Sequence, residues 1–135
     1  MQNQSLEDDF SSLTYPVFGL DGFVAVVTGA ARGFGRHTAL TLAKHGADVV
    51  GWDLILEELE PVAAQIDKFG RRSKAQRVNI TNIPEIYAAA EAIQKDFGRV
   101  DILVNCAGLN RPQWAEDVTE ENWDLIMNTN IKGLF

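Results

Sequence analysis

The stretch that decides the fold reads Thr28-Gly29-Ala30-Ala31-Arg32-Gly33-Phe34-Gly35. It follows the apolar run of residues 23–28, which is typical of a buried β-strand, and it opens a segment in which small residues recur at helical spacing. Glycines allow a tight turn and let the backbone approach a bound group closely. The free N–H groups and the positive dipole end of the following helix favour a phosphate. The stretch therefore predicts a pyrophosphate site between a strand and a helix.

A second signal is Asp53, an acid at the end of the next strand-like run, residues 48–53. A carboxylate there accepts hydrogen bonds from an adenosine ribose and repels a 2′-phosphate, so NAD is the favoured cofactor. Arg32 favours NADP, because a basic residue before the second glycine can meet a phosphate, and NADP stays an alternative. The competing interpretation is a glycine-rich turn with a solvated aspartate, which the combined context disfavours. A P-loop is excluded, since no Gly-Lys-Ser/Thr follows the turn.

Strand and helix patterns alternate along the rest of the chain. Strand-like runs cover residues 23–28, 48–53, 74–79 and 101–105, and helical patterns cover residues 59–69 and 83–97. Asn82 and Glu85 stand at capping-box spacing before the second of these helices. Such alternation indicates βαβ units, hence a parallel sheet with helices on both faces. We therefore predict an α/β fold, a Rossmann-type doubly wound parallel sheet with strand order 3-2-1-4.

The predicted sheet has fewer strands than a complete doubly wound fold. A doubly wound dinucleotide fold has six strands, and the patterns here account for four. The polar third strand is expected toward one edge, and the nearly all-apolar fourth strand would form an uncovered edge. We expect a polar tail over residues 1–20 and an NAD(P)-binding domain over residues 21–135. That domain is expected to be truncated after about four strands and incomplete at its C-terminus, since the chain stops on the apolar pair Leu134-Phe135.

Composition narrows the class of protein. Of 135 residues, 46% are apolar, and 12 basic against 19 acidic side chains give a net charge of −7, which disfavours nucleic acid as a partner. No apolar run approaches the roughly 18 residues that span a bilayer, and the polar start lacks the features of a signal peptide. One cysteine suits a reducing compartment, so a cytoplasmic protein is expected. His37 and His45 have no Cys or carboxylate partners at ligand spacing, so no metal site is expected.

Two further motifs follow the glycine stretch in the chain. Asn105-Cys106-Ala107-Gly108 stands after the fourth strand-like run, and a helical segment covers residues 123–130. With Thr28-Gly29-x-x-x-Gly33-x-Gly35 they resemble, in order, the cofactor signature, the Asn-Asn-Ala-Gly motif and the asparagine-bearing helix of the classical short-chain dehydrogenases/reductases. The resemblance covers residues 23–135. It implies an NAD(P)-dependent oxidoreductase that transfers hydride between an alcohol and a carbonyl compound.

The resemblance also implies a cofactor site at the strand ends. The pyrophosphate would lie on the glycine stretch, the adenosine ribose on Asp53, the adenine beside the loop after the third strand, and the second ribose beside the loop after the fourth. The residues expected to contact the cofactor are Thr28, Gly29, Arg32, Gly33, Phe34, Gly35, Asp53, Asn79, Ile80, Asn105, Ala107 and Gly108.

Asn79, Cys106 and Asn130 each have a distinct expected role. Asn79 stands where the family usually has an aspartate beside the adenine, and an amide can donate as well as accept there. Cys106 replaces the second asparagine of its motif, and we interpret it as a small packed residue rather than a reactive thiol. Asn130 is implied to be the catalytic asparagine that holds a water in a proton relay. It lies in the apolar stripe of residues 123–134, where a buried amide needs a structural or a functional partner.

The other catalytic residues of the family, a Ser and a Tyr-x-x-x-Lys pair, are missing. The two tyrosines are Tyr15 and Tyr87, and Glu91 rather than a lysine follows Tyr87 four residues on. The chain is thus expected to be the cofactor-binding portion of an oxidoreductase and inactive alone. The alternative is a non-catalytic dinucleotide-binding or interaction module. A methyltransferase is disfavoured, because its glycine loop differs.

Partners and loops complete the predictions. Residues 106–112 resemble family members that act on sugar acids and polyols such as gluconate, so the expected substrate is a small-molecule alcohol or ketone of that kind. The family usually pairs through the helix that bears Asn130 and the next helix, which implies a homo-oligomer for a full-length parent. Trp114 and the residues before it either border a substrate or pack as a surface loop. The basic run Arg71, Arg72, Lys74 and Arg77 favours a solvated loop, with a cofactor phosphate as the alternative.

Overall fold

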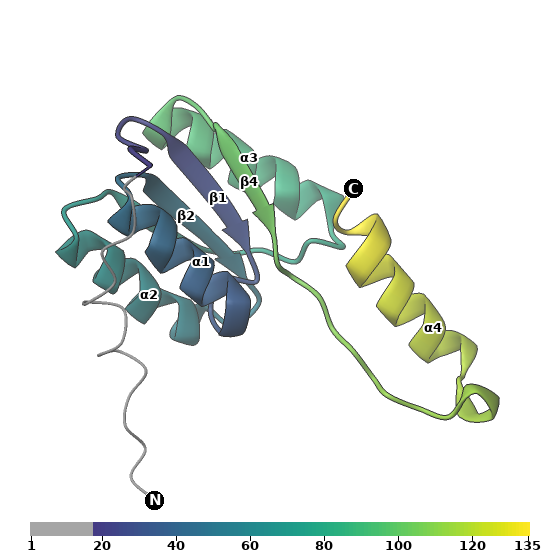
Figure 1. Ribbon diagram of the computed structural model, residues 1–135. Coiled ribbons are helices and arrows are strands. Elements are labelled where there is room, and N and C mark those ends of the chain that lie inside the picture. The colour runs from purple at the N-terminus through teal and green to yellow at the C-terminus, as the bar shows by residue number, and fades with distance from the viewer. Residues whose placement is uncertain (1–17) are drawn as a thin grey trace, which may run out of the picture.

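The computed structural model describes residues 18–135 (Figure 1). Residues 1–17, which hold most of the predicted tail, lie outside the described residues. Leu20 packs against the core and donates its backbone N–H to the His45 carbonyl (2.8 Å), so the folded part already includes it. The strands are β1 (Val24–Thr28), β2 (Asp48–Asp53), β3 (Ser73–Arg77) and β4 (Ile102–Asn105). The helices are α1 (Gly33–Lys44), α2 (Leu56–Lys68), α3 (Ile83–Phe97), α4 (Glu120–Met127), the 3-10 turn η1 (Ala115–Asp117) and the π-helical turn η2 (Asn128–Lys132).

The four strands form one parallel sheet in the order β3-β2-β1-β4, which confirms the predicted fold class and strand order. At its centre Val26 pairs with Val50 on β2 and with Leu103 on β4. The predicted strand limits agree to within two residues. β3 ends at Arg77 rather than Asn79, because the Asn79 side chain accepts the backbone N–H of Thr81 (3.0 Å) and turns the chain.

Helices cover both faces of the sheet, with α1 and α2 in front of it and α3 behind it in Figure 1. Ala25 and Val27 on β1 pack toward the α1 and α2 side, in one apolar cluster with Ala39 and Leu59. Val26 packs toward α3, in a second cluster with Ile93. Successive strand side chains point to opposite faces, so a strand that is covered twice needs the continuous apolar sequence seen here.

The start of α3 is tied to the loop that leaves β3. The Asn82 side chain accepts the N–H of Glu85 (3.4 Å), as the capping spacing predicts. The Glu85 carboxylate does not complete a capping box on the Asn82 backbone. It accepts the N–H of Asn79 (2.8 Å) and the side-chain amide of Asn82 (3.0 Å) instead. The helix ends at Gly98 in a left-handed conformation (φ +77°), which glycine adopts without a Cβ clash.

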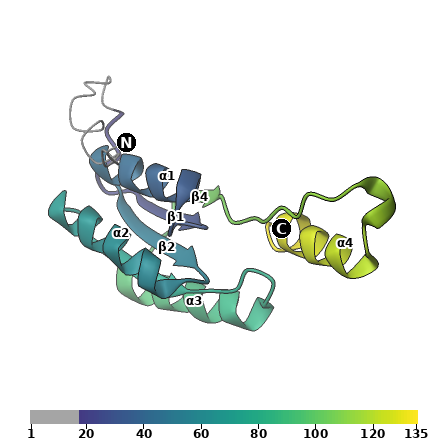
Figure 2. The same ribbon diagram turned by 90° about the horizontal axis from the view of Figure 1, so that it is seen from below.

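The C-terminal segment stands apart from the sheet. Both views place α4 beyond β4, at the end of an extended connection (Figures 1 and 2). Trp123 and Ile131 are 58% and 59% exposed, and no residue of α4 is buried. The predicted apolar stripe therefore exists but stays largely exposed among residues 18–135, although Asn130 within it contacts the loop after β4. Asn130 is half-buried rather than buried for the same reason.

Three of the four basic side chains in the run from Arg71 to Arg77 form ion pairs with carboxylates. Arg71 and Arg72 pair with Asp21 (2.8 Å) and Asp48 (2.7 Å), and Lys74 pairs with Asp96. The expectation of a solvated loop was wrong for Lys74 and Arg77, which lie in β3. Because β3 has a strand neighbour on one side only, its backbone can pair while its charged side chains stay in solvent. The three paired cations lie at or just before the amino end of β3, whereas the glycine stretch lies at the carboxyl end of β1. In a parallel sheet these are opposite edges, so the three cations do not lie beside the glycine stretch.

Asp101 makes the stability of this sheet sensitive to acid. Hydrogen bonds from the Arg99 side chain and from the Val24 backbone N–H (2.8 Å) lower its pKa from 3.8. A carboxyl with a lower pKa in the folded state stabilises the fold above its ordinary pKa and loses that contribution as the pH falls through the folded value. We expect Asp101→Asn to flatten the decline of the unfolding free energy below pH 3.8. Urea unfolding at pH 7 and pH 3 measures this, and equal declines in both proteins would contradict it.

Candidate functional site

Thr28 joins the glycine stretch after β1 to the loop after β4 through hydrogen bonds. The hydroxyl of this buried residue at the end of β1 accepts the backbone N–H groups of Cys106 (3.2 Å) and Ala107 (3.1 Å). The carboxyl ends of β1 and β4 are neighbours in the sheet, so one side chain reaches the loop that follows the other strand. The sequence predicts Thr28 near the pyrophosphate but does not predict this contact, because the contact depends on strand order.

Two glycines of the stretch allow close backbone approach. A Cβ atom at Gly35 would lie 2.0 Å from the carbonyl oxygen of Gly29, so the first turn of α1 presses directly on the loop. Gly29 has φ +66°, and a Cβ there would lie 2.8 Å from the backbone nitrogen and Cα of Ala107. The predicted loop residues and the Ala107 loop are thus brought together, and neither glycine admits a side chain.

The amino end of α1 is open. Gly33 has φ +55°, and a Cβ at this residue would meet no atom within 4 Å. Arg32 and Phe34 are exposed beside it, and α1 has no acid in its first turn and no side-chain cap from residues 18–135. The first N–H groups of a helix lack intrahelical acceptors. With no carboxylate of the helix competing for them, they are available to an external anion.

Asp53 lies at this open end and contacts the glycine stretch. Its Oδ2 accepts the N–H of Ala31 (3.0 Å) and its Oδ1 accepts the N–H of Ile55 (3.1 Å). A carboxylate oxygen can accept a second hydrogen bond, so both oxygens retain capacity for the hydroxyls of a ribose. The contact with Ala31 was not predicted, because residues 31 and 53 are brought together only by the pairing of β1 with β2.

The loop after β3 presents a fixed amide. The Oδ1 of Asn79 accepts both the N–H (3.0 Å) and the hydroxyl (2.8 Å) of Thr81, which leaves the Nδ2 donors of Asn79 for another partner. The spacing Asn-x-Thr is a signal for this turn that sequence analysis could have used. Ile80 lies against the C-terminal segment, since a Cβ at Gly133 would be 3.1 Å from its Cδ1.

Asn130 reaches the loop after β4 and holds it. Its Oδ1 accepts the N–H of Leu109 (2.9 Å), and its Nδ2 donates to the carbonyl of the same residue (2.8 Å). A Cβ at Gly108 would lie 3.2 Å from the Asn130 Oδ1. Asn130 sits in the π-helical turn η2, a type of turn found often at functional sites. Asn105 is exposed at the end of β4, and Cys106 is half-buried.

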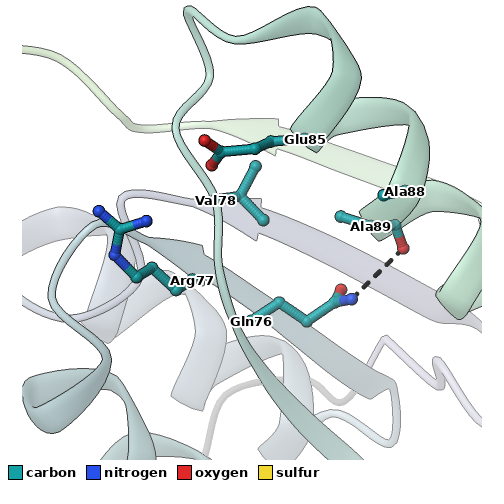
Figure 3. Close-up of a pocket in the computed structure, with 6 residues that line it drawn as sticks. All are labelled: Gln76, Arg77, Val78, Glu85, Ala88 and Ala89. Carbon is teal, nitrogen blue, oxygen red and sulfur yellow. Dashed lines mark hydrogen bonds between the residues drawn. The ribbon is translucent and has the colours of Figure 1, made fainter.

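A separate hollow of about 260 Å³ lies between β3 and α3 (Figure 3). The Gln76 amide there accepts from the indole of Trp52 (2.9 Å) and donates to the carbonyl of Ala89 (3.4 Å). The Glu85 carboxylate accepts hydrogen bonds from Asn79 and Asn82 in the β3–α3 loop. Arg77 points away from α3 in Figure 3. None of the predicted cofactor residues lines this hollow.

Metal-binding clusters and membrane-spanning helices are both absent from residues 18–135. No group of three or more His, Cys, Asp or Glu side chains in that part of the chain is placed to hold a metal ion. Among the described helices, none is long and apolar enough to cross a bilayer.

We expect Thr28→Val to destabilise the chain by about 1–3 kcal/mol, because it leaves two backbone N–H groups without their acceptor in a part-buried place. Urea unfolding measures the change. Thr28→Ser is the matched control, since it keeps the hydroxyl, and it should recover most of the loss. A serine variant as unstable as the valine variant would contradict the role of the hydroxyl.

Comparison with known proteins adds to this geometry. The family model described as short chain dehydrogenase matches residues 23–135. The 2-dehydro-3-deoxy-D-gluconate 5-dehydrogenase of Escherichia coli (strain K12) is 42% identical over 118 residues, which are 87% of this chain and 46% of that protein. The D-threitol dehydrogenase of Mycolicibacterium smegmatis is 38% identical over 134 residues, 99% of this chain and 49% of that protein.

A solved structure agrees with these matches. The short chain dehydrogenase from Mycobacterium paratuberculosis bound to NAD superposes with a TM-score of 0.81 at 30% identity, over 85% of this chain and 47% of that one. The chain thus spans about half the length of the proteins it matches.

Proposed function

The chain belongs to the short chain dehydrogenase family, and on that premise we propose that residues 23–135 bind NAD as the cofactor part of an oxidoreductase. The observation that supports this most is the Asp53 carboxylate, which lies 3.0 Å from the Ala31 N–H at the open start of α1. A dinucleotide has one group that suits the start of α1 and another that suits the Asp53 carboxylate. Its pyrophosphate suits the helix N-terminus, and its adenosine ribose suits the carboxylate.

The choice between NAD and NADP follows from charge. A 2′-phosphate would stand beside the Asp53 carboxylate, and like charges at contact distance repel. Arg32 is exposed at the same turn and makes no ion pair among residues 18–135, so it opposes this preference in part. We therefore propose NAD as the preferred cofactor, with NADP bound more weakly.

The remaining predicted residues take positions along such a cofactor. We propose that Asn79 and Ile80 border the adenine, with the Asn79 Nδ2 as donor, and that Asn105, Ala107 and Gly108 border the second ribose. Phe34, 90% exposed beside Gly33, would cover part of the cofactor. Asn130 is implied by the resemblance to be catalytic. Because Leu109 occupies its side-chain amide, we propose that Asn130 acts here by positioning the loop that follows β4.

Bound NAD supplies a hydride acceptor, and the reaction we propose for a whole protein of this kind is the interconversion of an alcohol and a carbonyl compound. A sugar acid or a polyol is the proposed substrate class, supported by residues 106–112 and by the two relatives named above. We propose a homo-oligomer, supported by the exposed apolar side chains of α4, and a cytoplasmic location, supported by the lone cysteine.

A second candidate is a dinucleotide-binding module that catalyses nothing. It is favoured by one observation, namely that neither Tyr15 nor Tyr87 has a lysine four residues on. Cofactor binding is common to both candidates, and turnover separates them.

Titration of the isotopically labelled chain with NAD, followed by amide chemical shifts, tests the proposed site. The shifts should concentrate on residues 29–35, on Asp53 and on residues 105–109. Ser73, at the amino end of β3, serves as the internal control and should not move. Shifts confined to the β3–α3 hollow, or absent altogether at millimolar NAD, would overturn the proposal.

A further inference from the structure

We propose that Asp53 is also a positioning residue for the glycine stretch, so that it acts on the phosphates of the cofactor as well as on the ribose. The inference rests on the proposed NAD function and deepens it. The contact that carries it is the hydrogen bond from the Ala31 N–H to the Asp53 Oδ2 (3.0 Å). A bond to an ionised acceptor is shorter and stronger than one between neutral groups.

A second hydrogen bond near this one also joins the glycine stretch to the end of β2. The neighbouring Ala30 donates its N–H to the carbonyl of Trp52 (3.2 Å), so two consecutive loop residues hold the last two residues of the strand. On the other side of Asp53, the N–H of Ile55 donates to Oδ1 (3.1 Å). The carboxylate is thus fixed from both sides, and its orientation does not depend on a ligand.

The loop between these contacts would otherwise have many conformations. Ala31 lies between Gly29 and Gly33, and glycines without a Cβ have wide backbone freedom in the absence of restraint, as the positive φ of both (+66° and +55°) illustrates. Ordering such a segment costs conformational entropy, and a contact that orders it before binding improves affinity. Since these residues form the proposed pyrophosphate site, the Asp53 contact lowers the cost of binding phosphates.

The two possible roles of Asp53 predict opposite changes in the affinity for a diphosphate ligand that lacks ribose hydroxyls. If the carboxylate served the ribose alone, its removal would not weaken a ligand without ribose hydroxyls. Loss of a nearby negative charge would even strengthen the binding of a diphosphate. If the carboxylate positions the loop, its removal weakens such a ligand. For NADP the two effects of Asp53→Ala oppose each other, because the variant frees the loop and also removes the repulsion of the 2′-phosphate.

Calorimetric titration of the 135-residue chain with ADP and with 2′,3′-dideoxy-ADP separates these roles. We expect Asp53→Ala to raise the Kd of 2′,3′-dideoxy-ADP about fivefold to tenfold, as expected for a charged hydrogen bond. Asp48→Ala is the matched control, because Asp48 accepts the N–H of Arg72 (2.9 Å) at the opposite end of β2. Its Kd should equal that of the wild type. Unchanged or tighter binding of the dideoxy compound by Asp53→Ala would overturn the inference.

A second measurement needs no variant and no ligand. In the unliganded wild-type chain, we expect the Ala31 amide hydrogen to exchange at least about tenfold more slowly than that of Arg32, whose N–H has no acceptor among residues 18–135. Equal exchange would overturn the inference even if Asp53→Ala failed to fold. Failure of the wild type to bind ADP would instead overturn the proposed function, so the two failures are distinguishable.

Discussion

Gly35→Ala is expected to weaken NAD binding at least about 100-fold and to destabilise the fold by about 3 kcal/mol. The added Cβ would lie 2.0 Å from the carbonyl oxygen and 2.6 Å from the carbonyl carbon of Gly29. Both are backbone atoms, so the clash can be relieved only by moving the glycine stretch away from α1. That movement would pull apart the loop and the helix N-terminus that are proposed to hold the pyrophosphate together.

The expected loss of stability is informative because helix propensity alone would make the Gly35→Ala variant more stable. Alanine inside a helix is favoured over glycine by about 1 kcal/mol, so a glycine without a packing role would give a more stable variant. Urea unfolding and calorimetry with NAD measure the two effects. Gly19→Ala is the matched control, since a Cβ there meets no atom of the described residues 18–135 within 4 Å, and it should change neither. A Gly35→Ala chain that binds NAD like the wild type would refute the close approach.

No turnover is expected from the 135-residue chain with any alcohol or ketone. A positioned general acid–base group contributes about 10²- to 10⁴-fold to rate, and the sequence holds no Tyr-x-x-x-Lys pair to supply one. The measurement is the absorbance of reduced cofactor with gluconate-type sugar acids and polyols at millimolar concentration. The control is Gly35→Ala, purified identically, which reports any host dehydrogenase in the preparation. Cofactor reduction above that control would contradict the expectation.

The fold could be predicted because its signals are local in sequence. Residues 23–28 and 48–53 are apolar enough to require cover on both faces, and the glycine stretch between them has one common use in βαβ units. Strand order then followed from the known arrangement of such units. The order β3-β2-β1-β4 confirms it.

The site was predicted as a set of residues and not as a set of contacts. Thr28 bonds to Cys106 and Ala107, and Asp53 bonds to Ala31, across separations of 78, 79 and 22 residues. Such pairs are set by register, and no periodicity within a segment reveals them. Asn130 shows the same limit, since its partner Leu109 lies in a loop without regular structure. The exposed placement of α4 was likewise beyond the sequence pattern, because an apolar stripe indicates a buried face without naming what covers it.

This fold is proposed to hold NAD with its ribose on Asp53 and its pyrophosphate on the glycine stretch. The most direct test is the ratio of the calorimetric dissociation constants for NAD and NADP, measured on the wild-type chain in one buffer. We expect NAD to bind at least about tenfold more tightly than NADP, because the 2′-phosphate of NADP meets the carboxylate. Equal affinities, tighter binding of NADP, or no binding of either at millimolar concentration would contradict it.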